Sequence, residues 1–382
     1  MPAARERGVA LPHVVMIGAG QLARMTHQAA ISLGVDFSVV ARNASESAVL
    51  GGAPARIADP TERRELESAL AGASVVTFDH ERIPPETLRA LAAAGFKFAP
   101  SVDAKLFAQD KAHARRELAR LGFPVPPFTV AEQIDQVESF AAEHGWPLVA
   151  KPPRGGYDGR GVFELRTLAE ARALLAEAGT LVLEPRLELI GELAVLVARS
   201  TSGEIVVYPV VETLQVDGMC REIVAPARVP PDEARLASEL ARSLAEAIDA
   251  TGVLALELFR TEHGLLINEL ALRPHNSGHY SIEGCVTSQF EQHLRAILGW
   301  PLGSTALTAP AVATVNVIGR SAERDPRTSL GRALAVRSAH IHLYAKQPRP
   351  GRKLGHVTVC GDDLQSALAE ARRAARILEG QA

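Results

Sequence analysis

The sequence has few cysteines and no excess of positive charge, and each absence excludes a class of protein. The three cysteines, Cys220, Cys285 and Cys360, are far apart and lack paired metal-ligand spacing. They predict buried thiols in a reducing compartment rather than a disulfide scaffold or a zinc site. The 41 Lys and Arg residues against 44 Asp and Glu residues give a net charge of -3. General nucleic-acid binding is therefore not expected, because it needs a clear basic excess.

Segments that target a chain to a membrane are also lacking. Residues 1–13 contain no apolar signal core, and no run approaches the length that crosses a bilayer. We therefore expect a cytoplasmic protein without a membrane partner. The 382 residues include 47% hydrophobic and 22% charged residues, with little low-complexity sequence and no internal repeat. This composition predicts a globular protein with room for two or three domains.

The first hundred residues alternate short apolar runs with helical stretches. The runs cover residues 14–17, 37–40, 75–78 and 96–98. This alternation predicts βαβ units around a parallel sheet, in a first domain over residues 1–108. Ligands are expected at the carboxyl ends of its strands.

A domain boundary is predicted just before a helix at residues 109–121. The proline-rich segment that follows ends this helix, because proline removes a donor and blocks the helical path. Residues 109–305 mix helices with hairpins, including 193–199 against 205–211, as expected for an α+β domain. Residues 306–382 predict a small third domain that ends in a helix.

Two glutamates, Glu257 and Glu269, occupy apolar strand-like runs joined by Glu262-His263-Gly264. A three-residue hairpin loop with glycine at its third place sets Thr261 opposite Leu265, and hence Glu257 opposite Glu269. Directly opposed like charges are destabilising, so a cation is expected between them. Mg²⁺ suits two carboxylates backed by the Asn268 amide, with substrate phosphates and water as its other ligands. The alternative is a solvent-facing acidic pair on an edge hairpin.

Gly18-Ala19-Gly20-Gln21-Leu22-Ala23 follows the first predicted strand and opens a helix, as a dinucleotide fingerprint does. The second strand ends at Ala41-Arg42-Asn43, with no acidic residue for an NAD ribose. Arg42 could serve NADP, so an oxidoreductase stays open. The alternative is a glycine turn that only packs a helix on a strand.

Residues 151–161 form a second glycine-rich segment, in which Lys151 is followed by four glycines and two arginines. Such a loop can fold its amides over an anion while its basic side chains neutralise charge. It is not a Walker loop, because the lysine precedes the glycines. A hairpin turn with solvated arginines is the alternative. Lys111 could add a second ammonium group, or be an ordinary surface lysine.

A further strand runs into a turn at Glu184-Pro185-Arg186-Leu187, where extended backbone could contact an adenine edge. Glu192, after Gly191, could accept a ribose hydroxyl. Taken alone, these residues are a strand, a turn and a solvated strand start.

In this order, these elements resemble the ATP-grasp superfamily and, within it, the N5-carboxyaminoimidazole ribonucleotide synthetase family. The resemblance covers residues 14–363. Its specific blocks are Gly20-Gln21-Leu22-Ala23-Arg24-Met25, Gly155-Gly156-Tyr157-Asp158-Gly159-Arg160-Gly161, Asn268-Glu269-Leu270-Ala271, Arg273-Pro274-His275-Asn276-Ser277-Gly278-His279 and Arg349-Pro350-Gly351-Arg352-Lys353-Leu354-Gly355-His356. It implies an α/β and α+β fold, with an N-terminal parallel-sheet βαβ domain, a central two-lobed ATP-grasp domain and a small C-terminal domain.

The family's activity carboxylates 5-aminoimidazole ribonucleotide with bicarbonate while ATP is hydrolysed to ADP and phosphate. By resemblance, Arg273 and His275 fix bicarbonate and carboxyphosphate, Lys353 joins them in catalysis, and Glu257 and Glu269 hold Mg²⁺. The implied ATP site comprises Lys111, Lys151, Gly155, Gly156, Tyr157, Asp158, Gly159, Arg160, Gly161, Glu184, Pro185, Arg186, Leu187, Glu192, Asn268 and Glu269. The implied ribonucleotide site comprises Gln21, Leu22, Glu81, Tyr157, Asp158, Arg160, Lys346, Arg352 and Lys353. A homodimer is implied as well.

Two departures from the family pattern leave the reactive groups in place. Leu272 stands where the family usually has proline, and Ala19 and Ala23 replace common glycines. Three alternatives remain: another ATP-grasp ligase such as a formate-dependent glycinamide ribonucleotide transformylase, the NADP oxidoreductase, and an inactive nucleotide-binding relative. The residues 275–279 and 349–353 favour the aminoimidazole enzyme, although the basic run could also be a solvated hairpin.

Overall fold

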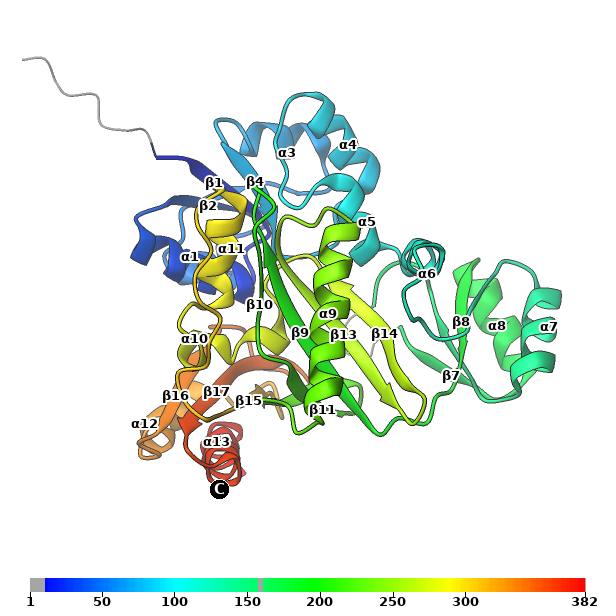
Figure 1. Ribbon diagram of the computed structural model, residues 1–382. Helices are drawn as coiled ribbons and strands as arrows, with labels where there is room; N and C mark the ends of the chain where they lie inside the picture. The colour runs from blue at the N-terminus through cyan, green and yellow to red at the C-terminus, as the bar shows by residue number, and fades with distance from the viewer. Residues whose placement is uncertain (1–10, 157–160, 382) are drawn as a thin grey trace, which may run out of the picture.

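The structure is a computed structural model, which describes residues 11–156 and 161–381. Three sheets organise the molecule (Figure 1). Four predicted site residues, Tyr157, Asp158, Gly159 and Arg160, lie outside the described residues.

The first sheet is parallel, with strand order β3-β2-β1-β4. Its strands are β1 (His13–Ile17), β2 (Asp36–Ala41), β3 (Ala55–Ile57) and β4 (Val75–Phe78), and its helices are α1 (Gln21–Leu33), α2 (Ser47–Leu50), α3 (Arg63–Ala69), α4 (Pro85–Ala93) and α5 (Val102–Gln109). The predicted parallel βαβ arrangement is confirmed. The predicted strand at 96–98 is wrong: Phe98 forms only an isolated bridge to Val76 and stacks its ring on Phe78, with centroids 5.7 Å apart.

The predicted helix at 109–121 is interrupted at its start. Helix α5 ends at Gln109, and α6 (Lys111–Arg120) begins after Asp110. The Asp110 side chain accepts a hydrogen bond from the His113 N–H at 3.0 Å and so caps α6.

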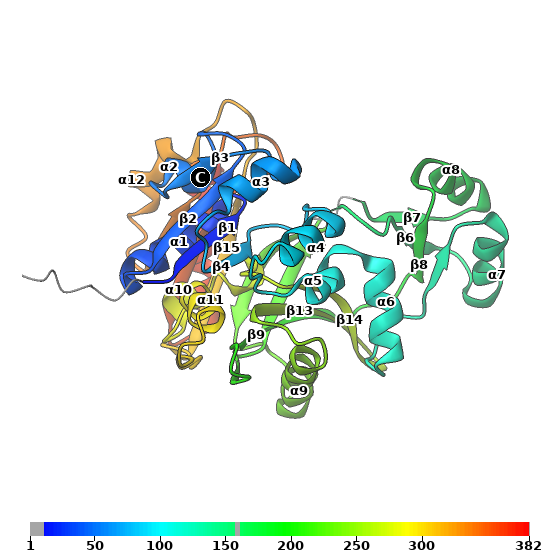
Figure 2. The ribbon, with the colours of Figure 1, turned by 90° about the horizontal axis from the view of Figure 1, so that it is seen from above.

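The second sheet forms a small lobe that projects from the rest of the molecule (Figure 2). Its order is β5-β8-β6-β7, and its neighbours are antiparallel. The lobe comprises β5 (Thr129–Ala131), α7 (Ile134–His144), β6 (Leu148–Lys151), β7 (Phe163–Leu165), α8 (Leu168–Ala178) and β8 (Leu181–Pro185). The two helices pack on the sheet through apolar side chains such as Val137, Phe140 and Leu175.

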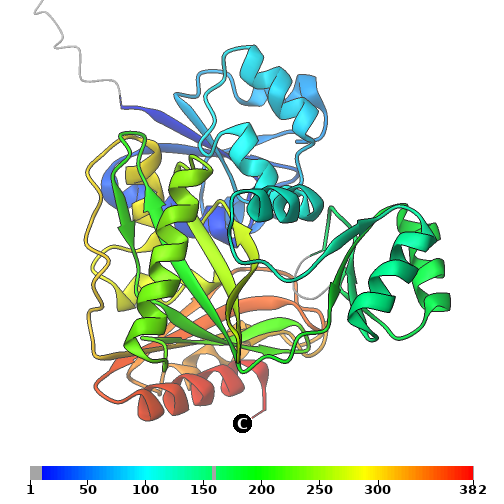
Figure 3. The same cartoon turned by 45° about the vertical axis from the view of Figure 1, so that its right-hand side comes forward.

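The third sheet has nine strands and occupies the centre of the molecule (Figure 3). Its main path runs β14-β13-β9-β11-β12-β15-β17-β16, and β10 pairs with β9. The strands are β9 (Gly191–Arg199), β10 (Ile205–Val207), β11 (Val211–Val216), β12 (Met219–Ala225), β13 (Gly252–Thr261), β14 (Gly264–Ala271), β15 (Ala311–Ile318), β16 (Ala339–Leu343) and β17 (Lys353–Gly361). The accompanying helices are α9 (Pro231–Ala247), η1 (Asn276–Gly278), α10 (Ser281–Gly284), α11 (Gln289–Ile297), η2 (Pro326–Ser329), α12 (Leu330–Ala333) and α13 (Leu364–Glu379).

Pairing between β12 and β15 makes the last part of the chain a continuation of the central sheet. The expected C-terminal helix is present as α13, which packs on β15 and β17. The expected hairpin at 193–211 is present too, through Ile205 opposite Arg199. The predicted domain limits, 1–108, 109–305 and 306–382, stay predictions.

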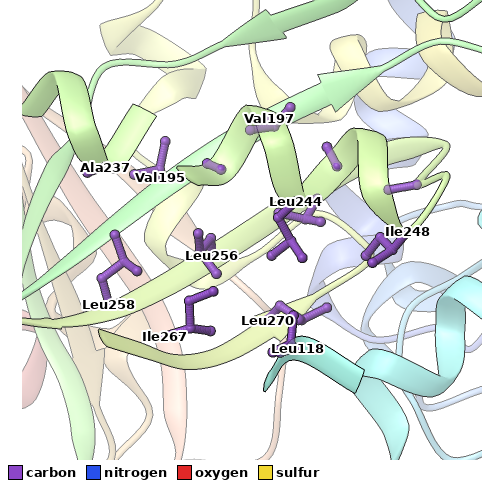
Figure 4. Packing of buried hydrophobic residues seen from close by; sticks show 14 of the residues in the cluster. Leu118, Val195, Val197, Ala237, Leu244, Ile248, Leu256, Leu258, Ile267 and Leu270 are labelled. Carbon is purple, nitrogen blue, oxygen red and sulfur yellow. The ribbon is translucent and has the colours of Figure 1, made fainter. Parts of the chain in front are cut away.

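The central core lies between α9 and one face of β9, β13 and β14 (Figure 4). Alternate residues of β13, Leu254, Leu256 and Leu258, face this core, whereas Val253 and Ala255 face a second cluster. Both faces are covered, which explains why β13 reads as a nearly continuous apolar run. A charged residue within this strand therefore stands out.

The β13–β14 hairpin holds the two glutamates in the expected pairing by an unexpected route. Its loop is two residues long, and Thr261 pairs with Gly264 rather than Leu265, so the predicted three-residue loop is wrong. A bulge between Glu257 and Leu258 then shifts the register by one residue, because Asn268 is the extra residue of β14. Glu257 lies opposite Glu269 as predicted.

Candidate active site

A buried ion-pair network joins the small lobe to the central sheet. Glu184 on β8 accepts from Lys151 Nζ at 2.7 Å and from Arg115 Nε at 2.6 Å. Arg115, on α6, also donates from Nη2 to the carbonyl oxygen of Asn268 at 2.7 Å. Burial would raise the pKa of Glu184, but Lys151 and Arg115 outweigh burial and lower it.

This network gives the Glu184 side chain a role different from adenine contact. Its two oxygens are engaged by cations that are themselves almost fully buried, so the carboxylate holds Lys151 in place. Any adenine contact then falls to the backbone of residues 184–187. Beyond Pro185, Arg186 is exposed and lies 3.4 Å from Glu164, between Nε and Oε2, and Leu187 is half-buried.

The second predicted lysine lies beside the glycine-rich segment. Lys111 Nζ donates to the carbonyl oxygen of Gly155 at 2.8 Å. Burial lowers the pKa of Lys111, the charge of Glu269 opposes this, and Lys151 adds to it. Gly155, Gly156 and Gly161 all have positive φ, a conformation in which glycine is favoured. Lys111, Lys151 and Glu269 are therefore brought into one electrostatic environment.

Glu192 and the glutamate pair line the neighbouring part of the central sheet. Burial and the charge of Glu269 raise the pKa of Glu192 to about 7, although a hydrogen bond with Gln215 opposes them. In the described part of the chain, no group of three or more His, Cys, Asp or Glu side chains could hold a metal ion by itself. Two opposed carboxylates with Asn268 at the bulge fit Mg²⁺ of the kind that takes its remaining ligands from substrate phosphates and water.

Arg273 and His275 follow β14 and lie next to these glutamates. Arg273 Nε donates to both oxygens of Glu81, at 2.8 and 3.0 Å. Burial would raise the pKa of Glu81, but Arg273 and Lys105 hold it at about 2. His275 Nδ1 lies 3.7 Å from Glu257 Oε1. Glu81, which the resemblance places in the ribonucleotide site, thus forms an ion pair that joins the N-terminal sheet to this site.

The remaining predicted ribonucleotide residues converge from the first and last parts of the chain. Lys346 Nζ lies 5.4 Å from the centre of the Tyr344 ring, Lys353 is buried, and Arg352 Nη1 donates to the carbonyl oxygen of Gln347 at 3.0 Å. Lys346 and Lys353 both act electrostatically on His279. Gln21 is half-buried at the start of α1, whereas the Leu22 side chain is buried in an apolar cluster with Phe290 and Tyr344.

The glycine turn after β1 does not present a free helix N-terminus. The N–H groups of Gly20 and Ala23 donate to the Asp79 carboxylate at 2.5 and 3.3 Å. A Cβ at Gly20 would lie 2.5 Å from Asp79 Oδ2. An acidic side chain therefore occupies the position where a dinucleotide phosphate would bind. The turn packs α1 against the residue that follows β4, which argues against the NADP reading.

Sequence reasoning missed Arg115 and Lys105. Lys105 is 1% exposed and donates from Nζ to the His80 carbonyl oxygen at 3.0 Å. Burial lowers its pKa to about 8. Neither residue belongs to a glycine-rich or acidic motif, and the partners of Arg115 lie 69 and 153 residues away in sequence. No local pattern could have identified them.

Most of the chain matches three families of known domains in succession. Residues 11–109 match the ribonucleotide synthetase preATP-grasp domain, residues 116–290 the ATP-grasp domain, and residues 312–370 the phosphoribosylaminoimidazole carboxylase C-terminal domain.

No helix in the described ranges is long and apolar enough to cross a membrane.

Individual relatives agree with these matches. The chain is 45% identical over 378 residues to N5-carboxyaminoimidazole ribonucleotide synthase of Mycobacterium tuberculosis (strain ATCC 25618 / H37Rv), covering 96% of this chain and 88% of that one. An N5-carboxyaminoimidazole ribonucleotide synthetase solved with ADP has a TM-score of 0.89 at 32% identity, over 98% of this chain and all of its own.

A third relative was solved with both kinds of ligand. The Aspergillus clavatus N5-carboxyaminoimidazole synthase, in complex with ADP and 5-aminoimidazole ribonucleotide, has a TM-score of 0.86 at 31% identity, over 97% of this chain and 99% of that one. The expected α/β and α+β ATP-grasp fold is confirmed. The chain belongs to the N5-carboxyaminoimidazole ribonucleotide synthase family of ATP-grasp ligases.

Proposed function

We propose that this chain carboxylates 5-aminoimidazole ribonucleotide with bicarbonate, using ATP, in purine biosynthesis. A bicarbonate oxygen attacks the γ-phosphorus of ATP, the bond to the β-phosphate oxygen breaks, and ADP and carboxyphosphate form. The substrate amine then bonds to the carboxyl carbon, directly or after CO2 is released, and phosphate leaves. Activation is needed because bicarbonate is a poor electrophile.

The main support from the structure is the strip of charges along the edge of the central sheet. Glu257 and Glu269 are paired on β13 and β14, and His275 Nδ1 lies 3.7 Å from Glu257 Oε1. Two cations, Lys111 at the start of α6 and Arg273 after β14, both interact electrostatically with Glu269 of this pair. Acidic metal ligands beside two cations suit the transfer of a phosphoryl group.

Each side chain then has a defined task. Lys111 and Lys151 hold the ATP phosphates, and Glu192 accepts a ribose hydroxyl. Glu257, Glu269 and Asn268 would hold Mg²⁺, which when bound neutralises charge that develops on the phosphoryl group.

Bicarbonate and the ribonucleotide are bound by residues that follow β14 in the sequence. Arg273 orients bicarbonate and the carboxyphosphate oxygens. The Ser277 N–H points to His275 Nδ1 at 3.3 Å, so in the neutral imidazole Nε2 carries the proton and can exchange it with substrate. Lys346, Arg352 and Lys353 bind the ribonucleotide phosphate. A homodimer and a cytoplasmic location are further parts of this proposal, from the family resemblance and the composition.

The deciding experiment measures ADP release with 5-aminoimidazole ribonucleotide, with and without bicarbonate, in buffer freed of CO2. We expect release to need both compounds. Formate with glycinamide ribonucleotide is the comparison, and faster release with that pair would replace this proposal by the transformylase alternative. A rate of ADP release that does not depend on any of these compounds would indicate a different ATPase.

A substitution in the C-terminal part tests the ribonucleotide site separately. Lys353→Ala should raise the KM for the ribonucleotide by about 10-fold or more, since a charge-assisted hydrogen bond contributes about 1.5–3 kcal/mol. The KM for ATP should change little. Equal weakening of both substrates would contradict separate phosphate sites.

A further inference from the structure

Gln289, the first residue of α11, holds the backbone of His275 with its side-chain amide. Oε1 accepts from the His275 N–H at 2.8 Å, and Nε2 donates to the His275 carbonyl oxygen at 2.7 Å. Gln289 and Ser281 are both fully buried. The Ser281 hydroxyl accepts a hydrogen bond from the backbone N–H of Gln289 at 2.9 Å. The Gln289 side chain therefore forms hydrogen bonds with both the backbone N–H and the backbone C=O of His275.

The amide is fixed from its other side as well. Nε2 lies 3.2 Å from His279 Nδ1, so both of its hydrogens have an acceptor. Gly278 lies against it so closely that a Cβ there would lie 2.4 Å from Gln289 Oε1. The amide cannot rotate or shift without disturbing the segment from His275 to His279.

The orientation of the His275 ring follows from its backbone. Its Nδ1 lies 2.9 Å from the Ser277 hydroxyl, two residues further along the same turn. The next residue of the turn, Asn276, exchanges two amide hydrogen bonds of 3.0 and 2.9 Å with Asn316. Gln289 on α11 and Asn316 on β15 thus both hold the turn in place through hydrogen bonds, and the direction of the His275 ring depends on both residues.

We propose that Gln289 is a positioning residue for the carboxylation reaction, acting through the backbone of His275. This inference rests on the proposed function, in which His275 touches bicarbonate or the carboxyphosphate. Removal of the amide donor would place a second acceptor against the His275 carbonyl oxygen and displace the turn. A displacement of about 1 Å can cost about 10²-fold in rate.

Helix α11 supplies a matched control in Gln292. This glutamine is also fully buried, and it holds the backbone of Gly303 in the same manner, with both bonds at 2.8 Å. Gly303 lies outside the site described above. Gln292→Glu therefore makes the same chemical change on the same helix without touching His275.

The experiment compares Gln289→Glu with Gln292→Glu at saturating ATP, ribonucleotide and bicarbonate. We expect Gln289→Glu to lower kcat by about 10²-fold, with the KM for ATP unchanged, whereas Gln292→Glu keeps kcat per folded enzyme. In a His275→Ala background, Gln289→Glu should change kcat by less than about 2-fold, because residues that act as one unit are not additive.

Equal loss of kcat in both glutamine variants would overturn the proposal, and so would full additivity with His275→Ala. If Gln289→Glu does not fold, Gln289→Met replaces it, since methionine has a similar length, removes both hydrogen bonds to the His275 backbone and should lower kcat in the same way. Hydrogen exchange of residues 275–279 gives a readout without turnover. Faster exchange in Gln289→Glu than in Gln292→Glu is expected, and equal exchange would reject the role even if wild-type assays disproved the proposed activity.

Discussion

Arg115 forms two hydrogen bonds across the junction of the small lobe and the central sheet. Its side chain is 5% exposed, and its partners are the Glu184 carboxylate and the Asn268 carbonyl oxygen. Removing one member of a buried ion pair leaves an uncompensated charge, which costs about 3–5 kcal/mol. The position of Lys151 depends on the same carboxylate, so Arg115 links the stability of the fold to the proposed binding of ATP by Lys151.

Arg115→Met should lower the free energy of unfolding by about 3–5 kcal/mol and raise the KM for ATP. Urea unfolding and ADP-release kinetics measure the two effects. Arg120→Met, on the same helix but with a side chain 67% exposed, is the control and should change neither. An unfolding midpoint for Arg115→Met equal to that of the control would mean that the buried network contributes little.

Glu269→Gln should reduce kcat by about 10²-fold or more, the effect of losing one group that stabilises developing charge. The fold should survive, since the substitution removes a like-charge opposition with Glu257. Thermal unfolding and turnover at limiting Mg²⁺ test this prediction. Glu262→Gln, in the exposed loop of the same hairpin, should behave as the wild type. Near-full activity of Glu269→Gln would remove the metal assignment.

The β13–β14 hairpin contains two irregularities whose effects on the strand register cancel each other. The shorter loop shifts the register by one residue, and the extra residue Asn268 shifts it back before Glu269. Deleting Asn268 would therefore give a regular hairpin in which Glu257 still faces Glu269.

We expect the Asn268 deletion to fold with a loss of about 1–3 kcal/mol, because Arg115 loses its carbonyl partner. Turnover should fall, since Asn268 is a predicted ligand. Deleting Leu266 is the control: it would turn the fully buried Ile267 out of the core and should prevent folding. Calorimetry distinguishes the two variants. Complete unfolding of both would show that the bulge itself is required.

The hairpin also shows how far sequence alone could go. Opposed glutamates in apolar runs were sufficient to predict the Glu257–Glu269 pair, yet the loop length was wrong, because one glycine fits more than one turn. In the first sheet, three apolar runs predicted three strands, but Phe98 packs on Phe78 instead of continuing a strand.

Residues that act through distant partners escaped prediction. Arg115 and Gln289 are defined by contacts with segments that only the folded chain brings near. Local periodicity reports whether a residue faces the core or solvent, and it contains no information about such contacts.

Across the whole molecule, three fully buried histidines connect its sheets and helices. His293, on α11, contacts Thr77 Oγ1 at 2.8 Å and accepts from the Val253 N–H at 3.1 Å. His279 stacks on His356 of β17, with ring centroids 4.7 Å apart. Burial lowers the pKa of His293 to about 3 and places the pKa values of His279 and His356 well below 6.5.

These histidines predict instability in acid. Below pH 6.5 they take up protons in the unfolded chain but stay neutral in the folded one. The contribution of these histidines to the free energy of unfolding is therefore fully present above pH 6.5. It falls as the pH decreases towards the pKa values of the folded state, by about 1.4 kcal/mol per pH unit for each histidine. Urea unfolding between pH 5 and 8 measures the slope. In His293→Gln the slope of unfolding free energy against pH should be smaller by the contribution of one histidine, about 1.4 kcal/mol per pH unit. An unchanged slope would contradict the lowered pKa of His293.

The pairing of β12 with β15 determines whether the last fifth of the chain, residues 306–382, could be separated from the rest. Cutting the chain after residue 305 would leave β12, an interior strand, as an unprotected edge with unpaired backbone N–H and C=O groups. Edges of this kind recruit other chains and promote aggregation. We therefore do not expect the C-terminal segment to behave as a detachable module, and the two parts should be expressed and engineered as a single unit.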